Sequence, residues 1–147
     1  MAYRGLSVLL LTDLDRHPCA PALQRDWLPG PVSDRLLFRV AVREVESWLL
    51  ADPEGLAGFL GISRAKIPPE PDQLPEAKGS LLSLAINSRK RGLRSEIFPA
   101  PGSTAPVGLG HNLQWGRFVR DHRSAPRAAE RSPSLKRAWV RILEFCG

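Results

Sequence analysis

The chain has 147 residues, of which 43% are hydrophobic and 24% charged, proportions that exclude a disordered or fibrous protein and indicate one globular domain over residues 1–147. No run of about eighteen apolar residues occurs, so we expect no membrane partner. The two cysteines, Cys19 and Cys146, and the lack of an evident export signal favour free thiols in a cytoplasmic protein.

Charge is unevenly distributed along the chain. Residues 1–76 contain 8 basic and 11 acidic side chains, whereas residues 77–147 contain 13 basic and 4 acidic ones. An acidic half joined to a basic half suits a polyanionic partner, with acids to hold a metal and arginines to hold phosphates. A basic surface that is simply solvated explains the same asymmetry.

The first half of the chain alternates between strand and helix patterns. A nearly continuous apolar run over residues 5–12 is typical of a buried strand, and residues 21–28, with proline in the first turn, favour a short helix. Residues 35–43 alternate as a second strand, and residues 44–52 and 53–60 then turn helical. This order predicts an α/β fold, with a mixed or parallel sheet flanked by helices.

The basic second half is predicted to be mainly helical. Prolines exclude regular structure over residues 67–75, and a helix closed by glycine is expected over residues 78–92. A long loop rich in proline and glycine follows over residues 99–112. Two more helices are expected, a short amphipathic one over residues 113–122 and one over residues 132–145 that begins with a serine cap and a proline.

Two aspartates follow the first strand, in the stretch LLLTDLDR. Side chains alternate along a strand, so Asp13 and Asp15 are expected to point to the same side, at the carboxyl end where open α/β sheets bind ligands. Two carboxylates held together repel each other unless a cation or a proton neutralises them. Hard oxygen ligands at this spacing suit Mg²⁺. The alternative is that one aspartate caps the next helix and the other faces solvent.

A glutamate among core residues is the second candidate. On a helical wheel of REVESWLLAD, Glu46 falls within the apolar arc, whereas Glu44 lies outside it. A buried carboxylate needs a cation or a base beside it. An ion pair between Glu46 and Arg39 or Arg43 meets that need without a metal. Because Asp13 and Asp15 are expected nearby, binding of a metal by Glu46 is the other explanation.

Three polar residues of the second half are candidates for contact with phosphate. Lys78 opens a helix, against the helix dipole, and a phosphate or a transition-state oxyanion would give a reason for that placement. In GLGHN the glycines allow the backbone to approach a phosphate closely, and His111 and Asn112 offer hydrogen bonds to it. A solvated lysine and a plain turn are the structural alternatives.

The helices after GLGHN are rich in arginine. Arg117, Arg120 and Arg123 are predicted to follow a nucleic-acid backbone, and Arg127 and Arg131 extend the series.

Nearly the whole chain is spanned by four stretches, LLLTDLD, FRVAVREVESWLLAD, GLGHN and AAERSPSLKRA, with a proline and then Lys78 between the second and the third. Together they resemble an uncharacterised bacterial family, domain of unknown function 4276, whose fold is similar to TOPRIM domains. The resemblance implies a Mg²⁺ or Mn²⁺ site in which Asp13 and Asp15 form the D-x-D pair, Glu46 is an additional acid and Lys78 assists phosphoryl chemistry. It also implies a partner ATPase and a role in defence against foreign DNA.

The sequence departs from this family at two points. The family's first strand, with its glycine-and-glutamate turn, has no counterpart ahead of the strand that carries D-x-D. We therefore expect the catalytic glutamate to be replaced by Glu44 or Glu46, or to come from another chain. His111 also stands where relatives carry an aromatic hydroxyl.

The sequence therefore favours a metal-dependent phosphodiester hydrolase or nuclease subunit that acts on nucleic acid, DNA rather than RNA. A catalytically incomplete module that binds nucleic acid or an ATPase through its basic half is the alternative, and a purely structural subunit is a third. Convergence of Asp13, Asp15 and Glu46 would discriminate between them.

Overall fold

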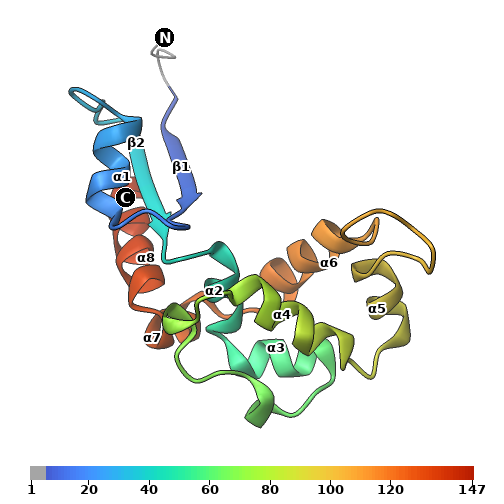
Figure 1. Ribbon diagram of the computed structural model, residues 1–147. Coiled ribbons are helices and arrows are strands. Elements are labelled where there is room, and N and C mark those ends of the chain that lie inside the picture. The colour runs from blue at the N-terminus through green and yellow to red at the C-terminus, as the bar shows by residue number, and fades with distance from the viewer. Residues whose placement is uncertain (1–5) are drawn as a thin grey trace.

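The protein combines a two-stranded parallel sheet with a body of short helices (Figure 1). The computed structural model describes residues 6–147. Strand β1 (Val8–Asp13) pairs in parallel with β2 (Leu36–Ala41), and helix α1 (Ala20–Trp27) connects them. The predicted α/β class is confirmed, and the expected start of the first strand, at residue 5, lies outside the described residues.

Two helices flank β2. The C-terminal helix α8 (Pro133–Cys146) packs along it, so that Ala41 shares a core cluster with Ala138. Helix α1 contributes Leu23 to a second cluster around Phe38. In the described part of the chain β1 has no neighbour on its other side, and its outer edge is therefore open.

The remaining helices form a second body around the main core. In chain order they are α2 (Val45–Leu50), α3 (Pro53–Leu60), α4 (Ala77–Ile86), α5 (Arg91–Ile97), α6 (His111–Arg117) and its π-helical continuation η3 (Phe118–His122). The largest apolar side chains that this core buries completely are Leu50, Leu56, Leu60, Leu81, Ile97 and Phe118. Helix α2 is the part of this body that lies next to the ends of the strands (Figure 1). Helix α7 (Ala125–Arg131) packs instead against α8, where Ala128 and Ala129 join the cluster of Ala41 and Ala138. No helix within residues 6–147 is long and apolar enough to cross a bilayer.

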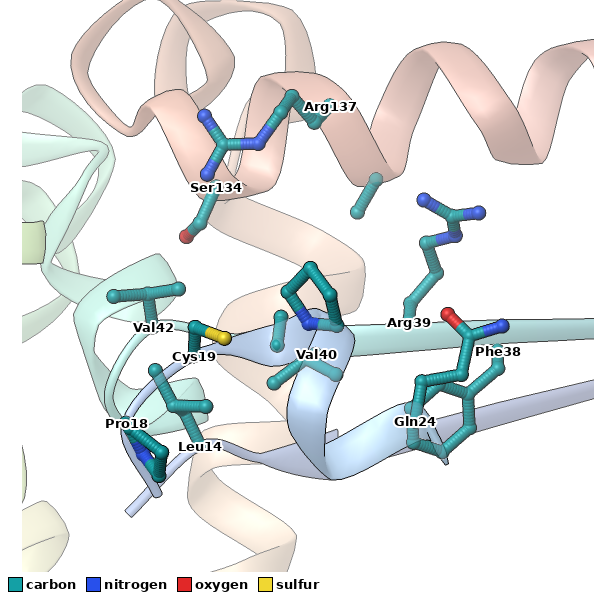
Figure 2. A pocket seen from close by; sticks show the side chains of 13 residues that line it. Leu14, Pro18, Cys19, Gln24, Phe38, Arg39, Val40, Val42, Ser134 and Arg137 are labelled. Carbon is teal, nitrogen blue, oxygen red and sulfur yellow. The ribbon is translucent and has the colours of Figure 1, made fainter. Parts of the chain in front are cut away.

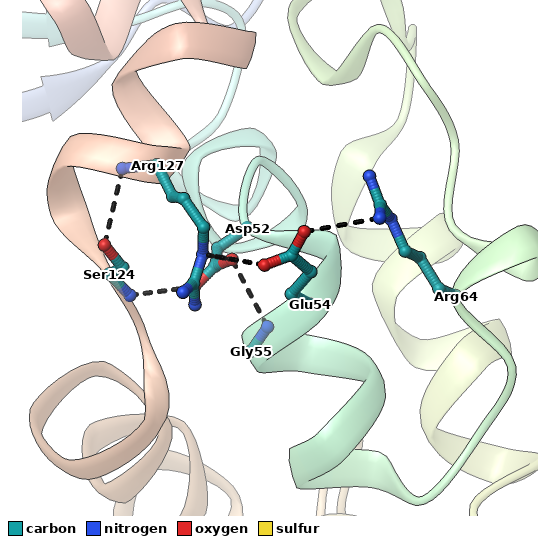
Figure 3. A network of polar contacts seen from close by, with 6 residues as sticks. All are labelled: Asp52, Glu54, Gly55, Arg64, Ser124 and Arg127. Carbon is teal, nitrogen blue, oxygen red and sulfur yellow. Dashed lines mark hydrogen bonds and ion pairs between the residues drawn. The ribbon is translucent and has the colours of Figure 1, made fainter.

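A buried aspartate fastens the start of α3 to α7. The Asp52 carboxylate, which is fully buried, accepts hydrogen bonds from the amides of Gly55 and Ser124, and Arg127 donates two more through Nε and Nη2 (Figure 3). Glu54 extends the network to Arg64. Asp52 thus caps α3, as its position before proline predicts, and also holds a segment 72 residues away in sequence.

The SPSL stretch anchors the start of α8. Ser132 caps the helix by accepting from the Leu135 amide, as expected, and its hydroxyl donates to Asp72. The other Asp72 oxygen accepts from the Ser134 amide at 2.8 Å, and the Trp48 indole donates to the Ser134 hydroxyl at 2.7 Å. SPSL and the WLLAD part of α2 therefore contact each other, which gives both a structural purpose.

The helix expected over residues 78–92 is wrong in extent, because it is two helices. Helix α4 ends at Ile86, and α5 begins at Arg91. Between them the buried Ser88 hydroxyl donates to the Leu60 carbonyl at 2.5 Å and accepts from the Lys90 amide. A serine that satisfies distant backbone groups in this way competes with continued helix.

Two loop expectations also need correction. Residues 67–75 are not wholly irregular, because Pro71–Gln73 forms a 3₁₀ turn, η2, with proline at its first position. The loop expected over residues 99–112 ends at Gly110, so that His111 and Asn112 belong to the first turn of α6.

Candidate functional site

The candidate site lies where β1 and β2 end. Because the strands are parallel, Asp13 at the end of β1 lies opposite Ala41 at the end of β2, and the chain then runs directly into α2. Asp13 Oδ1 accepts a 2.7 Å hydrogen bond from the Val45 amide. A carboxylate is favourable at a helix N-terminus, so Asp13 fixes the first turn of α2 against the strand.

Glu44 makes the equivalent contact with α4. Its Oε2 accepts a 2.8 Å hydrogen bond from the backbone amide of Lys78, in the first turn of that helix. The contact places a negative charge at the N-terminus of α4, which offsets the unfavourable position of the lysine. Lys78 is therefore held by its backbone, and its side chain remains exposed.

Glu46, Lys78, His111 and Asn112 line one cavity. The cavity measures about 160 Å³, and α2, α4 and α6 each contribute to it, with Trp115 among its apolar walls. His111 lies edge-on to Trp115, and its Nδ1 is buried without a hydrogen-bond partner among residues 6–147. The packing of three helices thus brings together polar residues that are up to 66 positions apart in sequence, and no local pattern specifies this arrangement.

Burial and neighbouring carboxylates raise the pKa values of Asp13 and Glu46. Burial raises the pKa of Asp13 above its usual value, and the hydrogen bond from Val45 opposes this while Asp15 and Glu44 add to it. Burial also raises the pKa of Glu46, helped by the charges of Asp13 and Glu44 and opposed by its own backbone amide and by Lys78. The acids lie close enough to influence one another, and Lys78 is the cation that lowers the pKa of both.

Asp15 departs from the expected geometry. The strand ends at Asp13, and Asp15 lies in a turn with a left-handed φ of 49°, where Asp and Asn are tolerated better than most residues. Its amide donates to the Arg43 carbonyl at 2.9 Å and its side chain is exposed. The prediction that strand alternation aligns the two aspartates is therefore wrong, although Asp15 is near enough for its charge to raise the pKa of Asp13.

The arginine alternative for Glu46 finds no support in the described residues. Within residues 6–147 Glu46 forms no ion pair with Arg39 or Arg43. Arg43 donates instead to the Asp15 carbonyl. The charged residues that influence the pKa of Arg39 are Arg141 and Glu144 of α8. The half-buried Glu46 carboxylate has Lys78 as its neighbouring cation.

The side chains around this site carry the kind of oxygen ligand that a hard cation prefers. Asp13, Asp15, Glu44 and Glu46 offer carboxylate oxygens, which are the ligands that Mg²⁺ and Mn²⁺ prefer. Residues 6–147 contain no three acidic, histidine or cysteine side chains arranged to hold a metal ion, so the convergence of Asp13, Asp15 and Glu46 on one metal site is not found there. Mg²⁺ is commonly held by one or two carboxylates, with water and phosphate completing its shell, so this arrangement is compatible with a cation that enters with its substrate.

The glycines of GLGHN approach protein backbone. Gly108 donates to the Ile97 carbonyl, and a Cβ on it would meet the carbonyl oxygens of Glu96 and Phe98. A Cβ on Gly110 would lie 2.7 Å from that of Glu96. The close approach that glycine allows is therefore made to the end of α5, and it positions the first turn of α6.

The three predicted nucleic-acid arginines have different surroundings. Arg117 is exposed, with no acidic partner among residues 6–147, whereas Arg120 pairs with the adjacent Asp121 at 2.9 Å. Burial lowers the pKa of Arg123, which lies near Asp52 and has two buried guanidinium nitrogens, Nε and Nη2, without a partner in the described chain. The further arginines Arg127 and Arg131 bond to Asp52 and to the Pro69 carbonyl.

The sequence interpretation underestimated two contributors to the site. Glu44 precedes α2 without capping it, and its hydrogen bond to α4 joins residues 34 positions apart, so no local signal predicts that contact. Trp115, which walls the cavity, belongs to the apolar face of a predicted amphipathic helix, and sequence alone does not separate such a residue from ordinary core.

Comparison of the chain with protein-family models, with curated proteins and with solved structures finds no match.

Proposed function

We propose that the protein is a metal-dependent phosphodiester hydrolase, a nuclease subunit that acts on nucleic acid. The observation that carries the proposal is the cavity shared by Glu46, Lys78, His111 and Asn112 beside the carboxylate of Asp13. Acids to hold a cation, a lysine to neutralise phosphate and two hydrogen-bonding side chains are the groups that phosphoryl chemistry requires. The unpartnered Nδ1 of His111 supports a ligand in the cavity wall.

In this proposal Asp13 and Glu46 would hold Mg²⁺ or Mn²⁺ together with water and phosphate, and Asp15 would add negative charge beside Asp13. The ion would polarise the phosphoryl oxygen and stabilise the charge that develops on it. The Lys78 ammonium pairs with a phosphate oxygen, while His111 and Asn112 orient the phosphate by hydrogen bonds. A bound phosphate would add negative charge beside these carboxylates and a cation would offset it, so ion and substrate are expected to bind cooperatively.

A TOPRIM-like domain is the finer fold assignment that we propose. The order of β1, α1 and β2, with acids at the strand ends, supports it. The open edge of β1 is where a strand from another chain would pair, and Val8, Leu9 and Leu11 expose apolar side chains there. A partner ATPase, DNA rather than RNA as substrate, and a role in defence against foreign DNA are parts of the same proposal.

A binding module without catalysis is the second candidate. The observation in its favour is that the carboxylates of Asp13 and Glu44 are both engaged in capping helices α2 and α4. Carboxylates with such a role can be retained for stability alone. In this case the basic half binds nucleic acid or the ATPase, and the acidic site binds no metal.

The deciding experiment measures metal binding and cleavage separately. Single- and double-stranded DNA and RNA are incubated with the chain in Mg²⁺, Mn²⁺ or EDTA, and Mn²⁺ binding is followed by electron paramagnetic resonance. Glu46→Gln is compared with Asp34→Asn, which removes an equal charge from an exposed position just before β2. The proposal expects Mn²⁺ binding and DNA cleavage that only Glu46→Gln abolishes.

The other outcomes are equally informative. Nucleic-acid binding with neither Mn²⁺ binding nor cleavage supports the binding module. If cleavage appears only after an ATPase partner is added, the catalytic site is completed by another chain. Cleavage that persists in Glu46→Gln overturns the assignment of the site.

A further inference from the structure

A second pocket follows the edge of β2 that β1 leaves free. It measures about 480 Å³ and lies between α8, which carries Arg137, and the start of α1, which carries Cys19 (Figure 2). Three successive strand residues, Phe38, Arg39 and Val40, line it. Since neighbouring residues of a strand point to opposite faces, a pocket lined by successive residues runs along the strand edge.

The backbone of β2 presents unpaired groups along this edge. Val8 and Leu14 of the β1 segment donate to the carbonyls of Arg35 and Ala41, so the odd-numbered residues of β2 face β1. Hydrogen-bonding direction alternates along a strand, and the N–H and C=O groups of Phe38 and Val40 therefore face the pocket. Such groups at an open sheet edge are a template for another strand.

The pocket is basic. None of the 13 residues that line it is acidic, and Arg39 and Arg137 project over it from β2 and α8 (Figure 2). Arg39 Nε is buried without a hydrogen-bond partner among residues 6–147. Burial, and then the charge of Arg141, lower the pKa of Arg39, and the nearby Glu144 bonds to Arg141 instead.

We propose that this pocket binds an extended acidic peptide of a partner protein, which adds to β2 as a third strand. Main-chain hydrogen bonds to Phe38 and Val40 provide the pairing, and acidic side chains of the peptide pair with Arg39 and Arg137. The apolar residues between the arginines and α1 accept uncharged side chains of the peptide.

Charge complementarity favours such a partner over a second copy of this chain. The open edge of β1 in a second copy offers one acid, Asp13, whose carboxylate already accepts a hydrogen bond from Val45 and cannot pair with both arginines. Pairing β2 with β2 would bring two basic edges together. This pocket also shares no lining residue with the cavity of Glu46, so the inference is independent of the proposed hydrolase activity.

The test uses a fluorescein-labelled octapeptide of alternating valine and glutamate. Its binding to the full chain is measured by fluorescence anisotropy, against the same peptide with lysine in place of glutamate and one with alternate backbone amides methylated. The double variant Arg39→Gln/Arg137→Gln is compared with Arg89→Gln/Arg91→Gln, which removes the same charge from exposed positions around the start of α5. Amide hydrogen exchange reports which edge is occupied.

The proposal expects the glutamate peptide to bind and the two comparison peptides to fail. Arg39→Gln/Arg137→Gln should weaken binding by about tenfold or more, the equivalent of one charge-assisted hydrogen bond, and the α5 control should leave it unchanged. Exchange at the amides of Phe38 and Val40 should slow, while exchange at Leu9 and Leu11, on the open edge of β1, should not. Binding that survives backbone methylation, or protection of β1 instead of β2, overturns the proposal. Slow exchange at Phe38 and Val40 that depends on protein concentration without peptide overturns it in favour of a second copy.

Discussion

The Asp52 carboxylate and the Arg127 guanidinium form a two-point ion pair, with Nε to Oδ1 at 2.9 Å and Nη2 to Oδ2 at 2.8 Å. Asp52 is completely buried, and the pair joins the first turn of α3 to α7 across 75 positions of sequence. The same carboxylate accepts from two backbone amides, so its loss would leave several donors unsatisfied.

We predict that Asp52→Ala lowers the free energy of unfolding by about 2–3 kcal/mol, because it removes a helix cap and a buried charge partner together. Urea denaturation followed by circular dichroism measures the change. Asp34→Ala, at an exposed position, should remain within about 0.5 kcal/mol of the wild type. Equal effects of the two substitutions would show that the Asp52 network contributes no net stability.

The same network has a pH signature. Burial alone would raise the pKa of Asp52, but the hydrogen bonds from Arg127, Ser124 and Gly55 outweigh it and hold that pKa below its usual value. An acid with a lowered native pKa stabilises the fold above its ordinary pKa and loses this contribution as the pH falls through the native value. Asp52→Asn should therefore show a weaker loss of stability below about pH 4 than the wild type does.

The opposite sign applies to Glu46. Its pKa is raised by burial and then by neighbouring carboxylates, so the native chain binds the proton more tightly than the unfolded chain. Stability should therefore fall as the pH rises from the ordinary glutamate pKa through the raised native value. We predict that Glu46→Gln raises the melting temperature at pH 8 without metal and loses this advantage near pH 3. Differential scanning calorimetry checks it, with Glu130→Gln on α7 as an exposed control; equal shifts in both variants would contradict the prediction.

Much of the fold follows from local patterns. The apolar run of β1, the alternation of β2 and the Asp-Pro start and Gly61 end of α3 are strong local signals, and those elements lie within a few residues of their predicted bounds. The break between α4 and α5 has no such signal, because the Ser88 hydroxyl bonds to a carbonyl 28 residues away. Tertiary hydrogen bonds of this kind cannot be inferred from a helical wheel.

The SPSL anchor leads to a further prediction. Ser134→Ala removes the acceptor of the Trp48 indole and leaves a buried N–H group unpaired, so we expect a loss of about 1–3 kcal/mol. Ser83→Ala is the matched control, since that serine is exposed on α4 and serine is a weaker helix former than alanine. It should be neutral or slightly stabilising. Chemical denaturation of both variants measures the difference, and an unchanged Ser134→Ala protein would refute the anchor.

Two glycines should respond oppositely to alanine. A Cβ at Gly108 meets backbone oxygens at the end of α5, which cannot move without disturbing the helix, so Gly108→Ala should destabilise the protein. Gly58 lies inside α3 with nothing within 4 Å of its Cβ position, and Gly58→Ala should stabilise by about 0.5–1 kcal/mol. Thermal unfolding of the two variants tests the pair. A Gly108→Ala protein that is as stable as the wild type or more stable would mean that this glycine is not needed for packing against α5.

The sequence predicts which residues form the candidate site, but it does not predict how they are arranged in space. Glu46 and Lys78 were found from charges at unfavourable helix positions, and both line the same cavity. Sequence reasoning missed that Asp15 leaves the strand and that Arg127 is paired with Asp52, because the first depends on a single left-handed residue and the second on a contact between distant helices. Charge counts alone therefore overstate the basic surface that is free for a polyanion.

That difference among the arginines leads to the last prediction, which applies if the chain binds nucleic acid. Arg117 is exposed with no acidic partner among residues 6–147, so Arg117→Ala should weaken binding to all sequences alike and flatten the salt dependence by about one phosphate contact. Arg120→Ala should have a smaller effect, because its guanidinium already bonds to Asp121 through Nε and Nη2. Anisotropy titrations of a labelled DNA duplex at several salt concentrations measure both slopes. If Arg117→Ala changes neither affinity nor slope, this face of α6 is only a solvated surface, and the nucleic-acid contact must be sought elsewhere on the basic half.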